Sequence, residues 1–166
     1  MRSPAGAPLG EVFAFVSGLY FRGKMTYARA FGRSENAEPA ALVMTAGGGL
    51  CTLDEPLTLE RLRRWHAVDI HEGNPHFTAP LVRHANLLLE AHSRETRLVL
   101  LGSIASNKYV EPLLEVFGER LLFPTEFAGR GDMSRGSLLL RAARDQRELE
   151  YAPVATRRSG TAKHDD

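Results

Sequence analysis

Two arginines alternate with glycines and acidic residues late in the chain, in the segment Glu126–Gly136. Arg130 and Arg135 each present a planar guanidinium fork that suits a phosphate or a carboxylate. Asp132 and Glu126 are carboxylates in the same segment that could exchange a proton with a ligand. We therefore expect a loop that binds an anion, with Asp132 or Glu126 as its acid or base. The alternative is a solvated loop closed by an internal Arg–Asp pair.

A second group of cations follows the first apolar run of the chain. Ser17 and a glycine end the run Val12–Val16, and Arg22 and Lys24 follow within the next turns. If a helix begins there, its unpaired N–H groups and partial positive charge also favour an anion. We expect Ser17, Arg22 and Lys24 to contact the ligand, against the alternative of a tight turn followed by solvated charges. Neither G-x-G-x-x-G nor G-x-x-x-x-G-K-[ST] is present, which excludes the usual nucleotide motifs.

Three consecutive glycines follow a second apolar run. Gly47, Gly48 and Gly49 come after Thr45, and a lone cysteine, Cys51, follows them. Ordering three glycines costs much backbone entropy, so such a loop indicates positive φ angles or a close approach to another group. We expect Thr45 and the glycines to face the ligand, and the alternative is close packing of a strand on a helix. Cys51 could be a nucleophile, but a small buried apolar residue is the more common role.

Ser103 follows a third apolar run and precedes an amphipathic segment. Ser106 or Asn107 is suited to cap the helix that begins there, which leaves Ser103 free to contact a ligand. No G-x-S-x-G motif surrounds Ser103, so the sequence does not predict a serine hydrolase.

Histidines and acidic residues are densest in the segment His66–His76. Zinc bound by H-E-x-x-H needs histidines four residues apart on one helical face, whereas His71 and His76 are five apart with a glycine and a proline between them. We therefore expect no metal here. Asp69 with either histidine could form an acid/base pair, and a polar loop bonded to its own backbone is the other possibility.

Alternating strand and helix patterns must position these segments. The expected strands are Val12–Val16, Ala41–Met44, Arg97–Leu101, Leu121–Phe127 and Glu148–Val154. The expected helices are Leu19–Phe31, Leu59–His66 with Asp54 or Thr58 as its cap, Pro80–His92, Val110–Phe117 and Ser137–Arg144. Such alternation favours parallel strands joined by right-handed crossovers. We expect one three-layer, Rossmann-like α/β sandwich with a mostly parallel sheet of four to five strands, and ligands at the carboxyl ends of the strands.

Composition limits the class of protein. The 166 residues, 43% of them hydrophobic, predict one domain over residues 11–154 between a flexible segment 1–10 and a disordered tail 155–166. The net charge of +1 allows nucleic-acid binding only through a local patch. A single cysteine fits a reducing compartment, and no apolar stretch approaches the roughly 18 residues of a membrane span. We expect a cytoplasmic protein; its cofactors and oligomeric state stay open.

Two short motifs resemble a known family. Phe21–Ala28 reads F-R-G-K-M-T-Y-A, and Thr45–Leu50 reads T-A-G-G-G-L. With the order of the other segments, from Val12 to Arg141, they resemble a family of small uncharacterised Rossmann-like proteins of bacteria and phages. The layout is more distantly similar to the central domain of archaeosine synthase, which acts on a modified base in tRNA. The resemblance implies a Rossmann-like fold and a ligand that carries a nucleobase.

Two classes of function follow from these observations. The first is a protein that binds an anionic, nucleotide-like or nucleobase-bearing ligand at the strand ends, as a hydrolase or transferase acting on it. The second is a binding or regulatory module without catalysis that contacts a protein or RNA partner. In that module Trp65, with Arg61, Arg63 and Arg64 nearby, would anchor the interface, because tryptophan and arginine are frequent interface hot spots.

Overall fold

The structure is a computed structural model that describes residues 5–35 and 40–156. Its helices are α1 (Leu9–Phe31), α2 (Leu59–His66), α3 (Pro75–Ala91), α4 (Asn107–Phe117) and α5 (Asp132–Arg144), with short 3-10 turns at Gly118–Arg120 and Thr125–Phe127. Its strands are β1 (Ala7–Pro8), β2 (Leu42–Thr45), β3 (Gly49–Thr52), β4 (Pro56–Leu57), β5 (Leu98–Val99), β6 (Leu121–Pro124) and β7 (Tyr151–Pro153).

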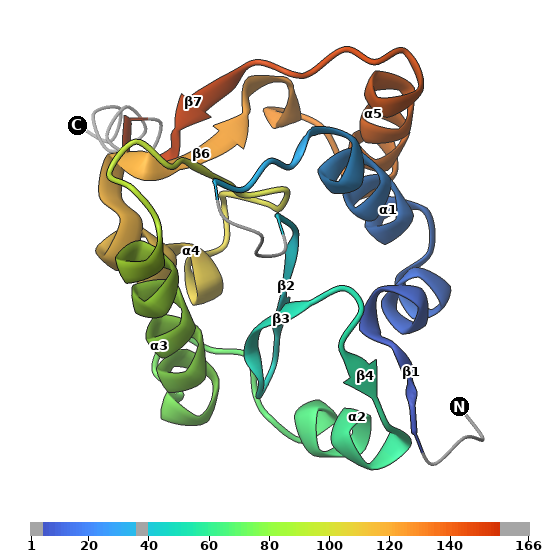
Figure 1. Ribbon diagram of the computed structural model, residues 1–166, viewed down its shortest axis with the longest axis vertical. Coiled ribbons are helices and arrows are strands. Elements are labelled where there is room, and N and C mark those ends of the chain that lie inside the picture. The colour runs from blue at the N-terminus through green and yellow to red at the C-terminus, as the bar shows by residue number, and fades with distance from the viewer. Residues whose placement is uncertain (1–4, 36–39, 157–166) are drawn as a thin grey trace.

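The strands form small separate sheets in the part of the chain that the structure describes (Figure 1). β1 pairs with β4 and β2 pairs with β3, both antiparallel. In the third sheet β5 is parallel to β6, and β7 is antiparallel to β6. The expected three-layer, Rossmann-like sandwich with a mostly parallel sheet of four to five strands is therefore wrong, because the described strands form sheets of two or three strands and β5–β6 is the one parallel pair among them.

The first expected strand is the main error. Val12–Val16 lies in the first half of α1, where Leu9 and Val12 are buried while Phe15 is 91% exposed. A short apolar run fits a strand or a helix equally well, and here its burial follows the helical period. The expected helix Leu19–Phe31 is the second half of α1. The two halves meet at a kink at Gly18, whose φ of 64° and ψ of −142° are accessible to glycine.

Other boundaries differ less. α2 begins where expected, with the Thr58 hydroxyl accepting a hydrogen bond from the Arg61 amide. The expected helix Val110–Phe117 lies within α4, which begins earlier, at Asn107. α3 begins at Pro75 instead of Pro80, because the Asn74 side chain caps it by accepting from the His76 amide at 3.1 Å.

The remaining differences concern the strands and the chain ends. β5 and β7 are shorter than expected, β6 ends at Pro124, and α5 begins at Asp132 rather than Ser137. Residues 7–10, expected to be flexible, form β1 and the start of α1; residues 1–4 and most of the expected disordered tail lie outside the described residues.

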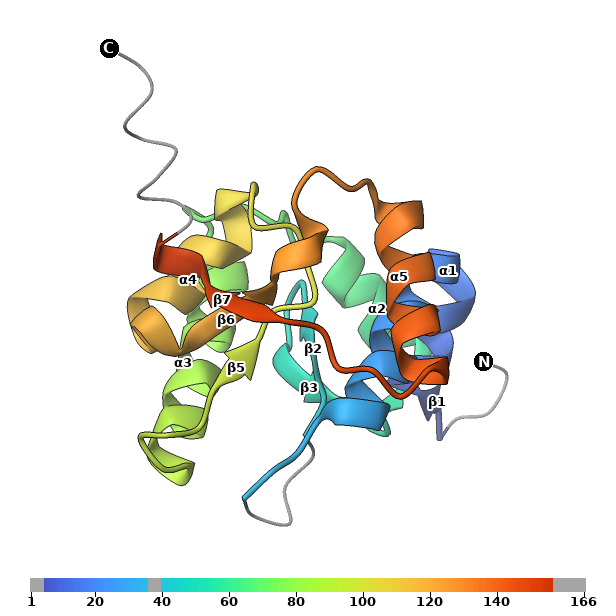
Figure 2. The same ribbon diagram turned by 90° about the horizontal axis from the view of Figure 1, so that it is seen from above.

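Four of the five described helices form two groups on either side of the β2–β3 hairpin, and α2 belongs to neither group. α1 and α5 lie side by side in one group, and α3 and α4 lie in the other beside β6 (Figures 1 and 2). Each group has its own apolar cluster, centred on Tyr27 and Leu139 in the first and on Leu81 and Val110 in the second. A cleft of about 1860 Å³ is lined by residues of both groups. None of the described helices is both long and apolar enough to cross a membrane.

Candidate functional site

The candidate site lies where α1 contacts α5, and two glycines make that contact close. A Cβ atom on Gly23 would lie 2.7 Å from the carbonyl oxygen of Gly136. A Cβ atom on Gly136 would lie 2.9 Å from Cα of Tyr20. The helices therefore meet backbone to backbone, which brings the first turns of α5 beside the middle of α1.

Five side chains gather at this contact, and we call them the α1–α5 cluster: Tyr20 and Lys24 from α1, Tyr109 from α4, and Asp132 and Arg135 from α5. The ammonium nitrogen of Lys24 lies 4.0 Å from the ring centroid of Tyr20, a cation–π contact. Nη1 of Arg135 lies 3.4 Å from Oδ1 of Asp132. The cluster thus combines two cations, one carboxylate and two phenols.

Arg135 is held in place from two sides. Its side chain is 15% exposed, and both Nε and Nη2 donate to the carbonyl oxygen of Phe127 at 3.4 Å. Its guanidinium also lies 5.6 Å from the ring centroid of Phe127. Asp132, by contrast, is 69% exposed, so the carboxylate is accessible while the guanidinium is ordered before any ligand arrives.

Burial changes the acidity of the cluster. Burial lowers the pKa of Lys24, Asp132 opposes this effect, and the positive charge of Arg135 adds to it. Burial also raises the pKa of Tyr20 and the pKa of Tyr109. Both phenols therefore stay protonated at neutral pH and each keeps an O–H group, while Lys24 loses its proton more easily than an exposed lysine.

The cleft gives access to one side of the cluster. Lys24 and Tyr109 line it, together with Gly102 and Lys108 from the loop before α4 and its first turn. Ser103, expected to contact a ligand, lies beside Tyr109, where a backbone hydrogen bond from Ser103 partly opposes the rise that burial causes in the pKa of that phenol. A ligand in the cleft would therefore meet two lysines and a tyrosine ring.

The structure brings four of the expected residues together and leaves others apart. Lys24, Arg135 and Asp132 belong to the cluster, and Ser103 adjoins it. Ser17 and Arg22 are exposed on α1, and none of the described contacts joins them to the cluster.

Arg130 and Glu126 stabilise the loop before α5 instead of joining the cluster. Arg130 donates to the Glu126 carbonyl at 2.8 Å and to the Ser134 hydroxyl at 3.1 Å. The Glu126 carboxylate pairs with Arg147 at 3.5 Å. Glu126 is therefore not placed to act as the acid or base of the cluster.

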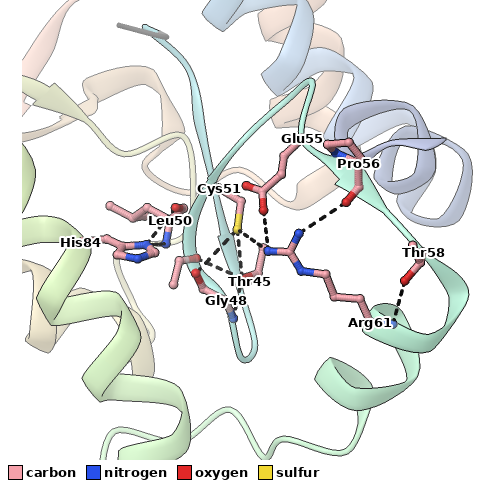
Figure 3. A network of polar contacts seen from close by, with 10 residues as sticks. Thr45, Gly48, Leu50, Cys51, Glu55, Pro56, Thr58, Arg61 and His84 are labelled. Carbon is pink, nitrogen blue, oxygen red and sulfur yellow. Dashed lines mark hydrogen bonds and ion pairs between the residues drawn. The ribbon is translucent and has the colours of Figure 1, made fainter. Parts of the chain in front are cut away.

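The glycine run turns the β2–β3 hairpin and is tightly packed. The Thr45 hydroxyl donates to the Gly49 carbonyl and accepts from the Gly48 amide, both at 3.0 Å (Figure 3). A Cβ atom on Gly48 would lie 2.5 Å from Cζ2 of Trp65, and one on Gly49 would lie 2.5 Å from the Pro80 carbonyl oxygen. The described contacts of these residues are thus those of close packing, the alternative considered for this run.

Cys51 belongs to β3 of the same hairpin. Its sulfur is 3.8 Å from the Thr45 hydroxyl and 3.8 Å from Nη2 of Arg61, which pairs with Glu55 (Figure 3). The thiol is buried, and burial raises its pKa. Cys51 is therefore protonated at neutral pH and unsuited to act as a nucleophile.

Trp65 is part of the core. It is 7% exposed, covers the glycine turn, and lies 4.5 Å beneath the guanidinium of Arg61. Because its ring is covered, it is not available as the surface anchor that the binding-module hypothesis requires.

The histidine-rich segment bonds to its own backbone. Nδ1 of His71 accepts from the Gly73 amide at 3.0 Å, and the Asn74 side chain donates to the Asp69 carbonyl at 2.7 Å. Across residues 5–35 and 40–156, no three His, Cys, Asp or Glu side chains are grouped so that they could hold a metal ion.

No family model, curated protein or solved structure matches the chain. A function for the α1–α5 cluster is therefore inferred from the arrangement of its residues. Sequence reasoning missed Tyr20 and Tyr109, although Tyr20 precedes Lys24 by four residues, the spacing that places two side chains on one helical face.

Proposed function

We propose that the protein binds a small anionic, nucleotide-like ligand at the α1–α5 cluster, on the side that meets the cleft. One observation carries this proposal: Lys24 and Arg135, far apart in the chain, converge beside two protonated phenols. Asp132 balances one of the two positive charges, and Lys108, which lines the cleft, adds a third. The local excess of positive charge favours an anion.

The burial of Lys24 supports the proposal that the ligand is an anion. A partly desolvated ammonium is disfavoured in the free protein, and a phosphate or carboxylate beside it would offset that cost. The Tyr109 ring lines the same cleft, where it could stack against a base, an interaction worth about 1–3 kcal/mol. A ligand with an anionic group and a planar base would use both features.

Asp132 is the carboxylate that a reaction at this site would use. It is exposed, adjoins the two cations and can accept or return a proton at the ligand. Hydrolysis of the bound ligand or transfer of one of its groups is therefore the chemistry that we propose for the site, with Asp132 as acid or base.

Thermal unfolding with a panel of nucleotides, nucleosides and free bases tests this function. We expect nucleotides to raise the unfolding midpoint, because a ligand at a hundred times its Kd adds about 2.7 kcal/mol of stability. Lys24→Met should abolish that rise. Arg22→Met, which removes an exposed cation from the same helix, is the matched control and should preserve it. A midpoint unchanged by every compound up to millimolar concentration would overturn the proposal.

A further inference from the structure

We infer that the site takes the terminal phosphate of a phosphomonoester and that the Tyr20 hydroxyl is one of its donors. This inference rests on the proposed function and names the group that the cluster recognises. The evidence is a buried hydroxyl, that of Tyr20, for which the described residues provide no hydrogen-bond partner.

The Tyr20 hydroxyl is the one buried side-chain polar atom of the described residues that makes no hydrogen bond. Leaving such a group unsatisfied costs about 1–3 kcal/mol, so buried hydroxyls normally have a partner. Tyr27, two turns further along α1, follows that rule: its hydroxyl lies 2.6 Å from the Tyr151 hydroxyl and accepts from the Leu149 amide at 2.8 Å. An unsatisfied hydroxyl beside two cations indicates a partner that arrives with a ligand.

That partner must be an acceptor. Arg135 lies close enough to the Tyr20 oxygen to lower the pKa of the phenol, but a guanidinium only donates hydrogen bonds, so it cannot accept from the Tyr20 O–H. Burial keeps the phenol protonated, so its O–H is available to donate. An oxyanion beside Lys24 and Arg135 supplies the acceptor and also meets the two positive charges.

Tyr20 does not itself line the cleft, so Lys24 must move for a ligand in the cleft to reach the hydroxyl. The Lys24 ammonium lies over the Tyr20 ring, and Lys24 lines the cleft. Its long side chain can turn toward an anion that enters from the cleft, which exposes the phenol beneath it. The stronger charge–charge contact then replaces the cation–π contact, which is worth about 0.5–2 kcal/mol.

The number of donors favours a phosphomonoester. A guanidinium has five N–H donors, and the described bonds of Arg135 use three of them, two to Phe127 and one to Asp132. Donors from Lys24, from Arg135 and from Tyr20 can each meet one terminal oxygen. A phosphomonoester has three such oxygens and a charge of about −1.5 to −2. A phosphodiester or carboxylate has two free oxygens and a single charge.

The test compares two substitutions and two ligands by calorimetry and thermal unfolding. The ligands are adenosine 5′-monophosphate and its 3′,5′-cyclic form, which share base and sugar and differ in the phosphate ester. We expect the monoester to bind at least about tenfold more tightly, since one lost hydrogen bond to a charged group has at least that effect. Tyr20→Phe should remove this preference while leaving the midpoint of the free protein unchanged or higher.

Tyr27→Phe is the matched control, because it removes a hydroxyl that has partners in the protein. It should lower the midpoint and leave the Kd of the monoester unchanged. Three results would overturn this inference but not the proposed function. They are equal affinity for the two nucleotides, wild-type affinity for the monoester in Tyr20→Phe, and a lowered unfolding midpoint in Tyr20→Phe. If the wild-type protein binds neither nucleotide nor inorganic phosphate, the proposed function fails, and this inference fails with it.

Discussion

Gly23 of α1 and Gly136 of α5 face one another so closely that neither position has room for a methyl group. The backbones of the two helices are therefore in contact at this point. The same contact sets the position of Tyr20 and Lys24 relative to Asp132 and Arg135, so packing and the candidate site depend on one pair of glycines.

We predict that Gly23→Ala destabilises the protein and weakens anion binding. The new methyl would lie 2.7 Å from the Gly136 carbonyl, so the helices must separate, and overpacking of this kind costs about 1–3 kcal/mol. Urea unfolding measures the loss. Gly131→Ala is the control, because no atom lies within 4 Å of its Cβ position. Equal stability of the Gly23 variant and the control would contradict the close contact.

The lowered pKa of Lys24 predicts that the stability of the protein depends on pH. The pKa of Lys24 is lower in the folded protein than in the unfolded chain, so the unfolded chain binds more protons between those two values. This group therefore destabilises the fold below its folded pKa, and the penalty disappears as the pH rises toward the ordinary lysine value.

Lys24→Met removes that penalty at every pH. We expect the variant to have a larger free energy of unfolding than wild type. The difference should be greatest at pH 7 and should decrease toward pH 10. Denaturant unfolding of both proteins across this range measures the difference, and other titrating groups cancel between them. A difference that does not change with pH would show that Lys24 is solvated.

The thiol of Cys51 should be slow to react in the folded protein. Because the group is buried and burial raises its pKa, we expect alkylation at pH 8 to be at least about tenfold slower in native protein than in urea. Mass spectrometry of iodoacetamide-treated samples measures both rates. A native rate equal to that of the unfolded chain would mean that the sulfur is exposed in the folded protein.

Gly48→Ala should disrupt the hairpin through Trp65. The added methyl would lie 2.5 Å from the Trp65 ring and 2.8 Å from the Thr45 hydroxyl, and we expect a loss of about 1–3 kcal/mol. Fluorescence follows the change, since Trp65 is the one tryptophan of the chain. Gly102→Ala, whose nearest contact is 3.5 Å, should leave stability nearly unchanged. The same emission and stability in both variants would argue against the packing described.

Part of the candidate site could be predicted from residue type alone. Lys24, Asp132 and Arg135 were expected to act together because cations and a carboxylate in glycine-rich segments suit an anion. Tyr20 and Tyr109 were not expected, since a tyrosine in an apolar segment is normally a core residue. Arg22 and Arg130 have the same chemistry as the cations of the cluster, and only the orientation of their helix and loop separates them from it.

Local spacing by itself determined α2 and α4, because apolar positions three and four apart fit a helix, and in α2 the Thr58 side chain also caps the first turn. Tertiary structure decided the state of Val12–Val16, since five apolar residues can be buried as either helix or strand and the neighbours that cover them lie elsewhere in the chain. It also decided the site. The contact of Gly23 with Gly136 joins segments more than a hundred residues apart, and no local pattern encodes how closely two backbones will approach.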